Sequence, residues 1–329
     1  MDNIEILDLE ETKPFSVLEN YGDDLTARIY ITNPAIAREE EIKKLIITLL
    51  TPEKSGLLVG KPGIGKTAIV EGLGYLIAKG DVPDALKGYR LIKLNSSSLT
   101  GKITIGNKEE MVLSLLVEEL KHTAKIIIFI DEIHTLIGNA SQGSMDLANM
   151  LKPGLDRGTI KAIGATTTIE YNTYVVRDRA FLRRFERIDV LEPDEATTIK
   201  ILLETLPKIE KQTGIKFRYN NYVAGTLIES IVSATSEFKR IYGLSGMYPD
   251  VAFSILTQAF SQALFKNKQE VTVEDVYNAI KTSKRIYPDT IIKELDLFKI
   301  KFKELCEEES IFLPNTTIED IKKGEDSYY

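Results

Sequence analysis

Three short apolar runs stand out in the first 190 positions of the chain and predict buried strands. They cover residues 56–59, 125–130 and 160–164. Between these runs, apolar residues recur three and four positions apart, which is typical of amphipathic helices. Helices that alternate with short apolar strands predict an α/β domain with a largely parallel sheet.

The second part of the chain shows helical spacing only. It predicts helices over residues 196–206, 222–233, 249–264 and 273–283. A further apolar stripe lies beyond Pro288 and consists of Ile291, Leu295, Phe298, Phe302 and Leu305. Because two heptads are too few for a convincing coiled coil, we expect this stripe to pack back onto the lid or the α/β domain. The alternative is that it docks on a neighbouring subunit or a partner.

These patterns divide the chain into four parts. Residues 1–32 are acidic and mixed and are expected to form an arm, whereas residues 33–192 form the large α/β domain. Residues 193–285 are expected to form an all-helical domain, which we call the lid. Residues 286–329 then form a C-terminal helix and an acidic tail, which we expect to be frayed from residue 307 onward.

The composition narrows the class of protein. Of 329 residues, 42 are basic and 49 acidic, and the net charge of −7 makes nucleic acid an unexpected partner. The single cysteine, Cys306, excludes an intramolecular disulfide, and two histidines leave little for a zinc site. No apolar run approaches the ~20 residues of a membrane span, and the acidic first residues do not resemble a signal peptide. We therefore expect a cytoplasmic protein with no membrane partner.

The strongest chemical motif is Gly-Lys-Pro-Gly-Ile-Gly-Lys-Thr at residues 60–67, which fits the phosphate-binding pattern G-x-x-x-x-G-K-[ST]. It follows a predicted strand and opens a predicted helix over residues 67–79. Glycines let backbone N–H groups wrap closely around a phosphate, and the helix N-terminus adds positive potential. We expect Lys66 to reach the β and γ oxygens of a triphosphate and the Thr67 hydroxyl to bind Mg²⁺.

A second motif ends the apolar run at 126–130 with two carboxylates, Asp131 and Glu132. Carboxylates at the end of a buried strand are costly unless they meet a metal or a polar ligand. With a phosphate loop upstream, we expect Asp131 to hold Mg²⁺ opposite Thr67 and Glu132 to polarise the attacking water. The alternative role for Asp131 is a cap on the following helix.

Two weaker signals follow along the chain. Thr166, Thr167 and Thr168 end the third predicted strand, where a hydroxyl can orient water, although a turn or a helix cap is the commoner role of such residues. Arg183 and Arg184 are adjacent, and phosphoryl transfer gains greatly from an arginine on the γ-phosphate. Paired arginines are more often a solvated surface.

Taken in this order, the motifs resemble those of the AAA+ ATPases, and most closely the first ATPase module of Clp-type ring unfoldases and disaggregases. The resemblance rests on residues 33–42, 65–72, 79–83, 129–135, 148–153, 164–167 and 178–185. It implies an AAA+ P-loop large domain with a helical lid, ATP or ADP as the nucleotide, and Mg²⁺ as its metal. It also implies a homo-oligomeric ring or spiral of six subunits that acts on a protein.

The resemblance assigns roles to individual residues as well. It makes Thr167 the sensor of the γ-phosphate and makes Arg183 and Arg184 fingers that act on the nucleotide of a neighbouring subunit. It implies a nucleotide site formed by Gly60, Pro62, Gly63, Ile64, Gly65, Lys66, Thr67 and Ala68 around the phosphates, with Pro34, Ala35, Ile36 and Ile201 around the adenine. His134 is expected to be structural because it has no metal-binding companions.

The chain departs from this family where a substrate would be gripped. The pore loop, which commonly carries an aromatic residue in K-Y-R-G, aligns with residues 103–106 and puts Thr104 at the aromatic position. No aromatic residue occurs between Leu94 and Leu120, and the second pore-loop candidate at 138–144 is short and uncharged. At the lid site where many AAA+ proteins offer a second sensor arginine, residues 245–253 contain no basic residue.

Other parts of the disaggregases are not expected here, namely the folded recruiting domain, the second ATPase module and the coiled-coil insertion. We expect a single-module Clp-like ATPase that couples ATP hydrolysis to the remodelling of a protein partner. The alternative is a nucleotide-controlled assembly or scaffold ATPase that threads no substrate, which Thr104 favours. A DNA-handling AAA+ loader is less favoured because the chain is acidic.

Overall fold

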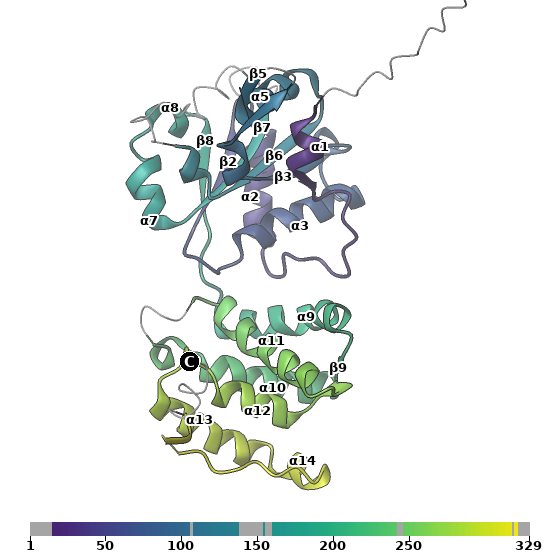
Figure 1. Cartoon of the computed structure of the whole chain (residues 1–329), viewed down its shortest axis with the longest axis vertical. Helices are drawn as coiled ribbons and strands as arrows, with labels where there is room; N and C mark the ends of the chain where they lie inside the picture. The colour runs from purple at the N-terminus through teal and green to yellow at the C-terminus, as the bar shows by residue number, and fades with distance from the viewer. Residues whose placement is uncertain are drawn as a thin grey trace, which may run out of the picture.

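The computed structural model describes residues 15–105, 108–137, 154, 160–241, 246–317 and 319–321, which form two domains stacked along the long axis (Figure 1). The large domain is built on a six-stranded sheet with the strand order β1-β3-β6-β7-β2-β8. Its strands are β1 (Gly22–Asp24), β2 (Ser55–Val59), β3 (Arg90–Asn95), β6 (Ile126–Asp131), β7 (Lys161–Thr166) and β8 (Phe185–Asp189). All neighbours pair in parallel except β1 and β3. The predicted parallel α/β sheet is confirmed.

Helices cover both faces of this sheet because successive residues of a strand point to opposite sides. Ile128 packs in one core with α1 (Val17–Tyr21) and α5 (Val112–His122). Ile127 and Phe129 pack in a second core with α2 (Glu39–Leu50) and α3 (Lys66–Lys79). The shorter elements are η1 (Asp84–Leu86), α4 (Ser96–Leu99), the hairpin strands β4 (Lys102–Ile105) and β5 (Lys108–Met111), η2 (Ile133–Leu136), α7 (Thr168–Glu170), η3 (Tyr171–Val175) and α8 (Arg179–Leu182).

Residues 15–32 pack on the sheet instead of extending as the expected arm. Strand β1 pairs with β3, and Val17 and Leu25 are fully buried. The carboxylate of Glu119 on α5 accepts hydrogen bonds from the backbone N–H groups of Val17 (2.8 Å) and Leu18 (3.2 Å). The described part of the segment therefore belongs to the large domain, and the boundary that we placed at residue 33 lies too late.

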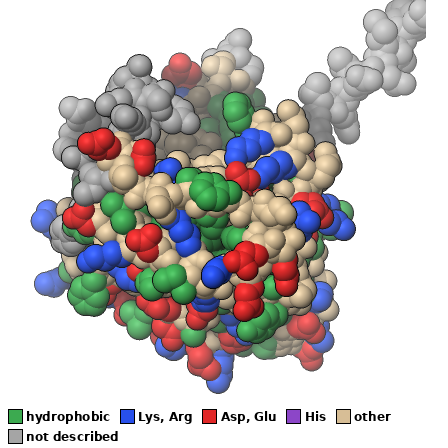
Figure 2. All heavy atoms as spheres, turned by 90° about the horizontal axis from the view of Figure 1, so that it is seen from below, with side chains coloured by type: hydrophobic (Ala, Val, Ile, Leu, Met, Phe, Trp, Pro, Cys, Tyr) green, Lys and Arg blue, Asp and Glu red, His purple; other side chains and the backbone are tan. Residues whose placement is uncertain are grey.

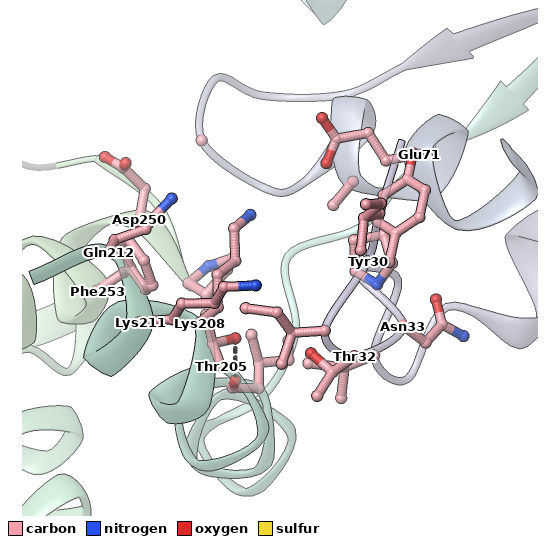
Figure 3. A pocket seen from close by; sticks show the side chains of 18 residues that line it. Tyr30, Thr32, Asn33, Glu71, Thr205, Lys208, Lys211, Gln212, Asp250 and Phe253 are labelled. Carbon is pink, nitrogen blue, oxygen red and sulfur yellow. Dashed lines mark hydrogen bonds between the residues drawn. The ribbon is translucent and has the colours of Figure 1, made fainter. Parts of the chain in front are cut away.

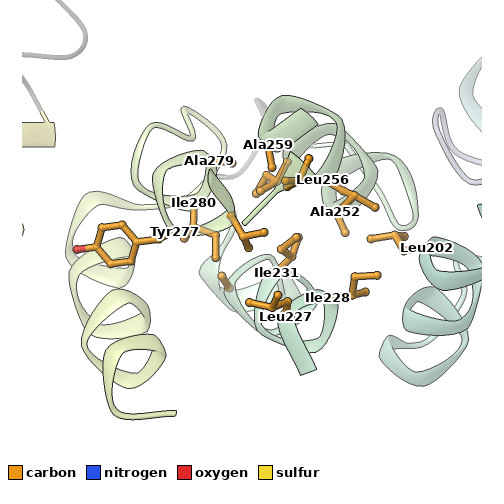
Figure 4. Packing of buried hydrophobic residues seen from close by; sticks show 14 of the residues in the cluster. Leu202, Leu227, Ile228, Ile231, Ala252, Leu256, Ala259, Tyr277, Ala279 and Ile280 are labelled. Carbon is orange, nitrogen blue, oxygen red and sulfur yellow. The ribbon is translucent and has the colours of Figure 1, made fainter. Parts of the chain in front are cut away.

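The lid consists of α9 (Glu195–Thr213), α10 (Asn221–Ala234), η4 (Glu237–Lys239), α11 (Asp250–Phe265) and α12 (Val273–Lys281). Apolar residues from these helices meet in one core, including Leu202, Leu227, Ile231, Leu256 and Ile280 (Figure 4). The expectation of an all-helical lid needs one correction. Strands β9 (Lys216–Phe217) and β10 (Glu270–Val271) pair in parallel at its edge.

The C-terminal stripe packs back onto the lid. Ile291, Leu295 and Phe298 of α13 (Pro288–Lys301) are buried in the lid core, so this segment extends the lid beyond residue 285. The helix breaks at Phe302, and α14 (Lys303–Glu308) follows. The tail is not frayed where it is described, since the Tyr277 hydroxyl donates to the carbonyl of Pro314 at 2.7 Å.

The surface of the lid seen in Figure 2 mixes acidic, basic and hydrophobic side chains, and no continuous basic area covers this face. In the part of the chain that the structure describes, no helix is both long and apolar enough to cross a membrane.

Candidate functional site

The three chemical motifs meet at one edge of the sheet. Strands β6, β7 and β2 are neighbours and run in parallel, so that their carboxyl ends lie together. The loop of residues 60–65 leaves β2, Asp131 ends β6, and Thr166 ends β7. Strand β7 lies between the other two, so the threonines at its end lie between the phosphate loop and Asp131.

The loop between β2 and α3 depends on its glycines. Gly63 has a φ of +77° and Gly65 a φ of +96°, a backbone region that side chains disfavour. At Gly60, a Cβ atom would lie 2.5 Å from the carbonyl oxygen of Val190, which leaves no room for a side chain. The loop then enters α3 at Lys66, so backbone N–H groups and the helix N-terminus face the same point.

The Lys66 ammonium lies over this loop. It donates to the carbonyl oxygens of Gly60 (2.8 Å) and Lys61 (3.0 Å). Burial lowers the pKa of Lys66, and the negative charge of Asp131 opposes that change. A cation beside the N-terminus of a helix suits the oxygens of a phosphate.

Thr67 and Asp131 form the centre of the predicted metal site. The Thr67 hydroxyl donates to Asp131 Oδ2 at 3.0 Å, and the Lys93 ammonium lies 3.9 Å from the same oxygen. Asp131 Oδ1 accepts from the backbone N–H of Glu132 at 3.1 Å, so the carboxylate also supports the local turn. Hydroxyl and carboxylate oxygens are the ligands that Mg²⁺ takes together with phosphate oxygens, so this donor set fits the metal.

Glu132 follows directly and is exposed at the same edge. Its φ of +51° lies in the left-handed region, where residues other than glycine are uncommon. This conformation begins η2 directly after the strand. Backbone strain of this kind is often found at functional positions, which agrees with a catalytic role for the side chain.

The two threonines at the end of β7 have different partners. Thr166 is 2% exposed, and its hydroxyl lies 3.0 Å from His134 Nδ1. Thr167 caps α7 in a reciprocal capping box with Glu170. The helix-cap reading of Thr167 is thus present in the structure, and its hydroxyl must leave Glu170 to act as the predicted sensor. His134, expected to be structural, stacks on Tyr174 with ring centroids 6.1 Å apart.

Arg183 and Arg184 lie at the opposite end of the strands, where β2 and β8 begin. They directly precede β8, whose first residue is in register with Ser55, the first residue of β2. The carbonyl oxygen of Arg183 accepts from Lys54 Nζ at 2.9 Å. At about 3.3 Å per residue, the length of β2 separates both arginines from the phosphate loop of their own chain by roughly 16 Å.

A cavity of about 580 Å³ lies between the large domain and the lid, beside the phosphate loop (Figure 3). Pro34, Ile36 and Ile201 line it, as expected for an adenine pocket. Ala35 does not line it, because its side chain is 2% exposed and packs against α3 at Gly72. The Ala35 side chain is therefore not part of the cavity wall, and its contact with adenine stays a prediction.

No pattern in the sequence indicated several of the side chains around this cavity. Tyr30, Glu71, Lys208, Lys211, Asp250 and Phe253 line it from four separate segments of the chain (Figure 3). Only the stacking of the lid on the large domain brings these segments together. The candidate acidic pore loop at 138–144 lies outside the described residues.

Comparison with known proteins agrees with this geometry. The AAA family, described as "ATPase family associated with various cellular activities", matches residues 56–192. The chaperone protein ClpB of Gloeobacter violaceus is 39% identical over 263 residues, which are 78% of this chain and 29% of that protein. ClpB of Porphyromonas gingivalis is 34% identical over 95% of this chain and 34% of that protein. The chain thus spans about a third of the length of these relatives.

Solved structures show the same likeness. An ADP complex of Hsp104 from S. cerevisiae has a TM-score of 0.65 and 35% identity, and covers 89% of this chain and 47% of that chain. An extended Hsp104:casein complex from S. cerevisiae has a TM-score of 0.68 and 30% identity, over 91% and 54% of the two chains. The chain carries an AAA+ ATPase module of the Clp type. Within that class it is similar to the ATPase modules of ClpB and Hsp104.

Proposed function

We propose that this chain hydrolyses ATP in a homo-oligomer, with arginines from a neighbouring copy completing the site, and remodels a protein partner. One observation carries the proposal. The phosphate loop, the Thr67–Asp131 pair and Glu132 converge at the carboxyl ends of the strands. Arg183 and Arg184 lie at the amino ends. Each copy therefore has the groups that act on its own nucleotide at one end of the strands and the two arginines at the other end.

The nucleotide is bound at two points. The adenine lies in the cavity between Ile36 and Ile201, and the phosphates lie on the loop beneath Lys66. Because the cavity has walls from both domains, the bound nucleotide ties the lid to the sheet. This arrangement links the nucleotide state to the orientation of the lid, which is the movement that remodelling requires.

Hydrolysis depends on the groups at the strand ends. Glu132 accepts a proton from the attacking water, and Lys66 holds the charge that develops on the phosphate oxygens. Mg²⁺, held by Thr67 and Asp131, would neutralise phosphate charge. Thr167 leaves its capping box with Glu170 and orients the water from the central strand.

The arginines act between subunits. A separation of roughly 16 Å exceeds the reach of an arginine side chain, so neither Arg183 nor Arg184 can serve the loop of its own chain. Arg183 is exposed at these far ends of the strands, where a neighbour in a head-to-tail ring or spiral of six can reach it. An arginine supplied in this way raises the rate of phosphoryl transfer by about 10³–10⁵-fold.

The decisive experiment is complementation between inactive variants. Arg183→Ala/Arg184→Ala and Glu132→Gln should each be nearly inactive alone. A mixture should regain activity, because Arg183 and Arg184 of the Glu132→Gln subunit serve the intact loop of its neighbour. Mixing Glu132→Gln with Lys66→Ala provides the matched control. Both residues act on the nucleotide of their own chain, so no subunit in this mixture has an intact site and activity should not recover. No recovery in the first mixture, together with a turnover per wild-type subunit that stays constant upon dilution to a monomer, would contradict the proposal.

A scaffold ATPase that threads nothing remains the second candidate, and the hairpin β4–β5 favours it. Thr104 is exposed on β4 opposite Glu109, and a Lys102–Glu109 ion pair of 3.7 Å crosses the hairpin. This hairpin carries polar and charged side chains at the position where the related unfoldases commonly have a substrate-contacting aromatic residue. Unfolding of a tagged folded substrate distinguishes the two functions.

A further inference from the structure

Lys93 is a charged residue in the interior of strand β3. Its neighbours in the strand, Ile92 and Leu94, are buried in the core of the large domain. A charge among buried residues is costly unless it is paired. Asp23 lies directly opposite Lys93 on β1, but the carboxylate of Asp23 is ion-paired with Arg28.

The ammonium of Lys93 instead reaches the carboxylate of the candidate metal site. Lys93 is in register with Phe129 on β6, and Asp131 lies two residues further along that strand, about 6.6 Å away at 3.3 Å per residue. The four-carbon stem spans this distance, and Lys93 Nζ lies 5.9 Å from the centre of the Phe129 ring and 3.9 Å from Asp131 Oδ2. The Lys93 ammonium and the Thr67 hydroxyl therefore converge on the same oxygen.

This arrangement places a positive charge directly beside a site that suits a divalent cation. Lys93 balances part of the negative charge of Asp131 before any ligand binds, and it repels a second cation that approaches the same oxygen. The side chains of Lys93 and Asp131 are 31% and 33% exposed, so a ligand can reach both. Nucleotide phosphates on the neighbouring loop would add several negative charges, which reverses the balance in favour of a metal.

We propose that Lys93 makes the entry of Mg²⁺ depend on bound nucleotide, because it weakens the affinity of the Asp131 site for free Mg²⁺. This inference rests on the proposed function, since it requires nucleotide phosphates on the loop. The flexible stem of Lys93 lets its ammonium turn from Asp131 to phosphate oxygens once they are present. The protein therefore takes up little Mg²⁺ alone and binds the metal together with its nucleotide.

The test titrates the full chain with Mn²⁺, which shares the oxygen ligands of Mg²⁺ and whose free form is counted by electron paramagnetic resonance. Titrations are made without nucleotide and with one ADP bound per subunit. Lys93→Met keeps the stem and removes the charge, so it should raise the Mn²⁺ affinity of the nucleotide-free protein by about tenfold or more. With ADP bound, the Mn²⁺ affinity should change by less than about threefold. Lys93→Gln should behave in the same way, whereas Lys93→Arg should keep the wild-type values.

Two controls separate this local effect from a change in net charge. Lys87→Met removes an exposed lysine of the same domain, which is paired with Asp84, and should leave both Mn²⁺ affinities unchanged. Asp131→Asn in the Lys93→Met protein should abolish the gain, because the added affinity depends on that carboxylate. Retained ADP binding reports that each variant is folded.

Three results would overturn the inference and leave the proposed function intact. They are no gain in Mn²⁺ affinity for nucleotide-free Lys93→Met and Lys93→Gln, an equal gain with and without ADP, or a gain that survives Asp131→Asn. Failure of the wild type to bind ADP or ATP would instead overturn the proposed function, and this inference with it.

Discussion

The Thr67 hydroxyl and the Asp131 carboxylate, 64 positions apart in the chain, meet at 3.0 Å. Thr67 lies in the first turn of α3 and Asp131 ends β6, two strands away from β2 in the sheet. Their distance therefore depends on the register across three parallel strands. The sheet as a whole positions the site, and substitution of single residues around Thr67 and Asp131 tests the role of each.

Glu132→Gln should slow ATP hydrolysis by at least ~10²-fold while nucleotide binding is preserved, because the amide cannot take a proton from water. The two measurements are steady-state phosphate release and the dissociation constant of ATP with Mg²⁺. Glu186→Gln is a matched control, since it alters an exposed carboxylate on β8 and should keep the wild-type turnover. Wild-type turnover in Glu132→Gln would show that the base lies elsewhere.

Lys66→Ala should lose most of the affinity for ATP. The ammonium lies over the loop within 3.0 Å of two carbonyl oxygens, where it adds the charge that the phosphates require. Lys61→Ala removes an exposed lysine of the same loop and should change affinity little. Equal losses in both variants would mean that the net charge of the loop matters more than the position of Lys66.

Thr104→Tyr should increase the unfolding of a tagged fluorescent protein, which the wild type should unfold weakly or not at all. A tyrosine adds about 150–250 Å² of surface that can be buried against almost any side chain, at roughly 25 cal/mol per Å². Loss of substrate fluorescence measures the unfolding, and ATP turnover controls for damage to the site. Strong unfolding by the wild type, undiminished in Thr104→Gly, would restore a general unfoldase as the favoured function.

The stability of the lid should fall as the pH rises above 10. Burial raises the pKa of Tyr248 from its ordinary value of 10.0 to about 12. The unfolded chain then loses its proton first, so the stabilisation is complete below pH 10 and is lost as the pH rises toward 12. Tyr248→Phe should reduce this loss by roughly 2 kcal/mol at pH 11.5. Urea unfolding at pH 8 and 11.5 measures it, and Tyr222→Phe, at a residue 84% exposed, should keep the wild-type pH dependence.

Sequence patterns predicted the sheet because buried strands such as Ile126–Asp131 are marked by consecutive apolar residues. They also predicted where the candidate site lies, since parallel strands bring their carboxyl ends, and the motifs that follow them, together. The segment at 22–24 was missed for a physical reason. Gly22, Asp23 and Asp24 have no strand propensity, and they pair with β3 only because Val17 and Leu25 on either side are buried.

The lid side of the site was not predictable in the same way. Contacts such as that of Arg285 with Asp250 depend on how separate helices pack, and no spacing in the sequence specifies them. The same holds for Ala35, whose position beside Ile36 suggested a place in the cavity. Its small side chain instead fills the space that Gly72 leaves on α3, which fixes the loop against that helix.

Strand β1 also has a bearing on solubility. Without it, the six residues of β3 would form the outer strand and present unpaired N–H and C=O groups along their whole length. A long exposed edge of this kind is a template for pairing with another chain. Strand β1 covers half of that edge with three residues, two of which are aspartates. Both carboxylates are ion-paired, Asp23 with Arg28 and Asp24 with Arg90. Such a short edge with charged side chains resists strand-to-strand aggregation, so copies of this protein can be concentrated in an assembly without fusing their sheets.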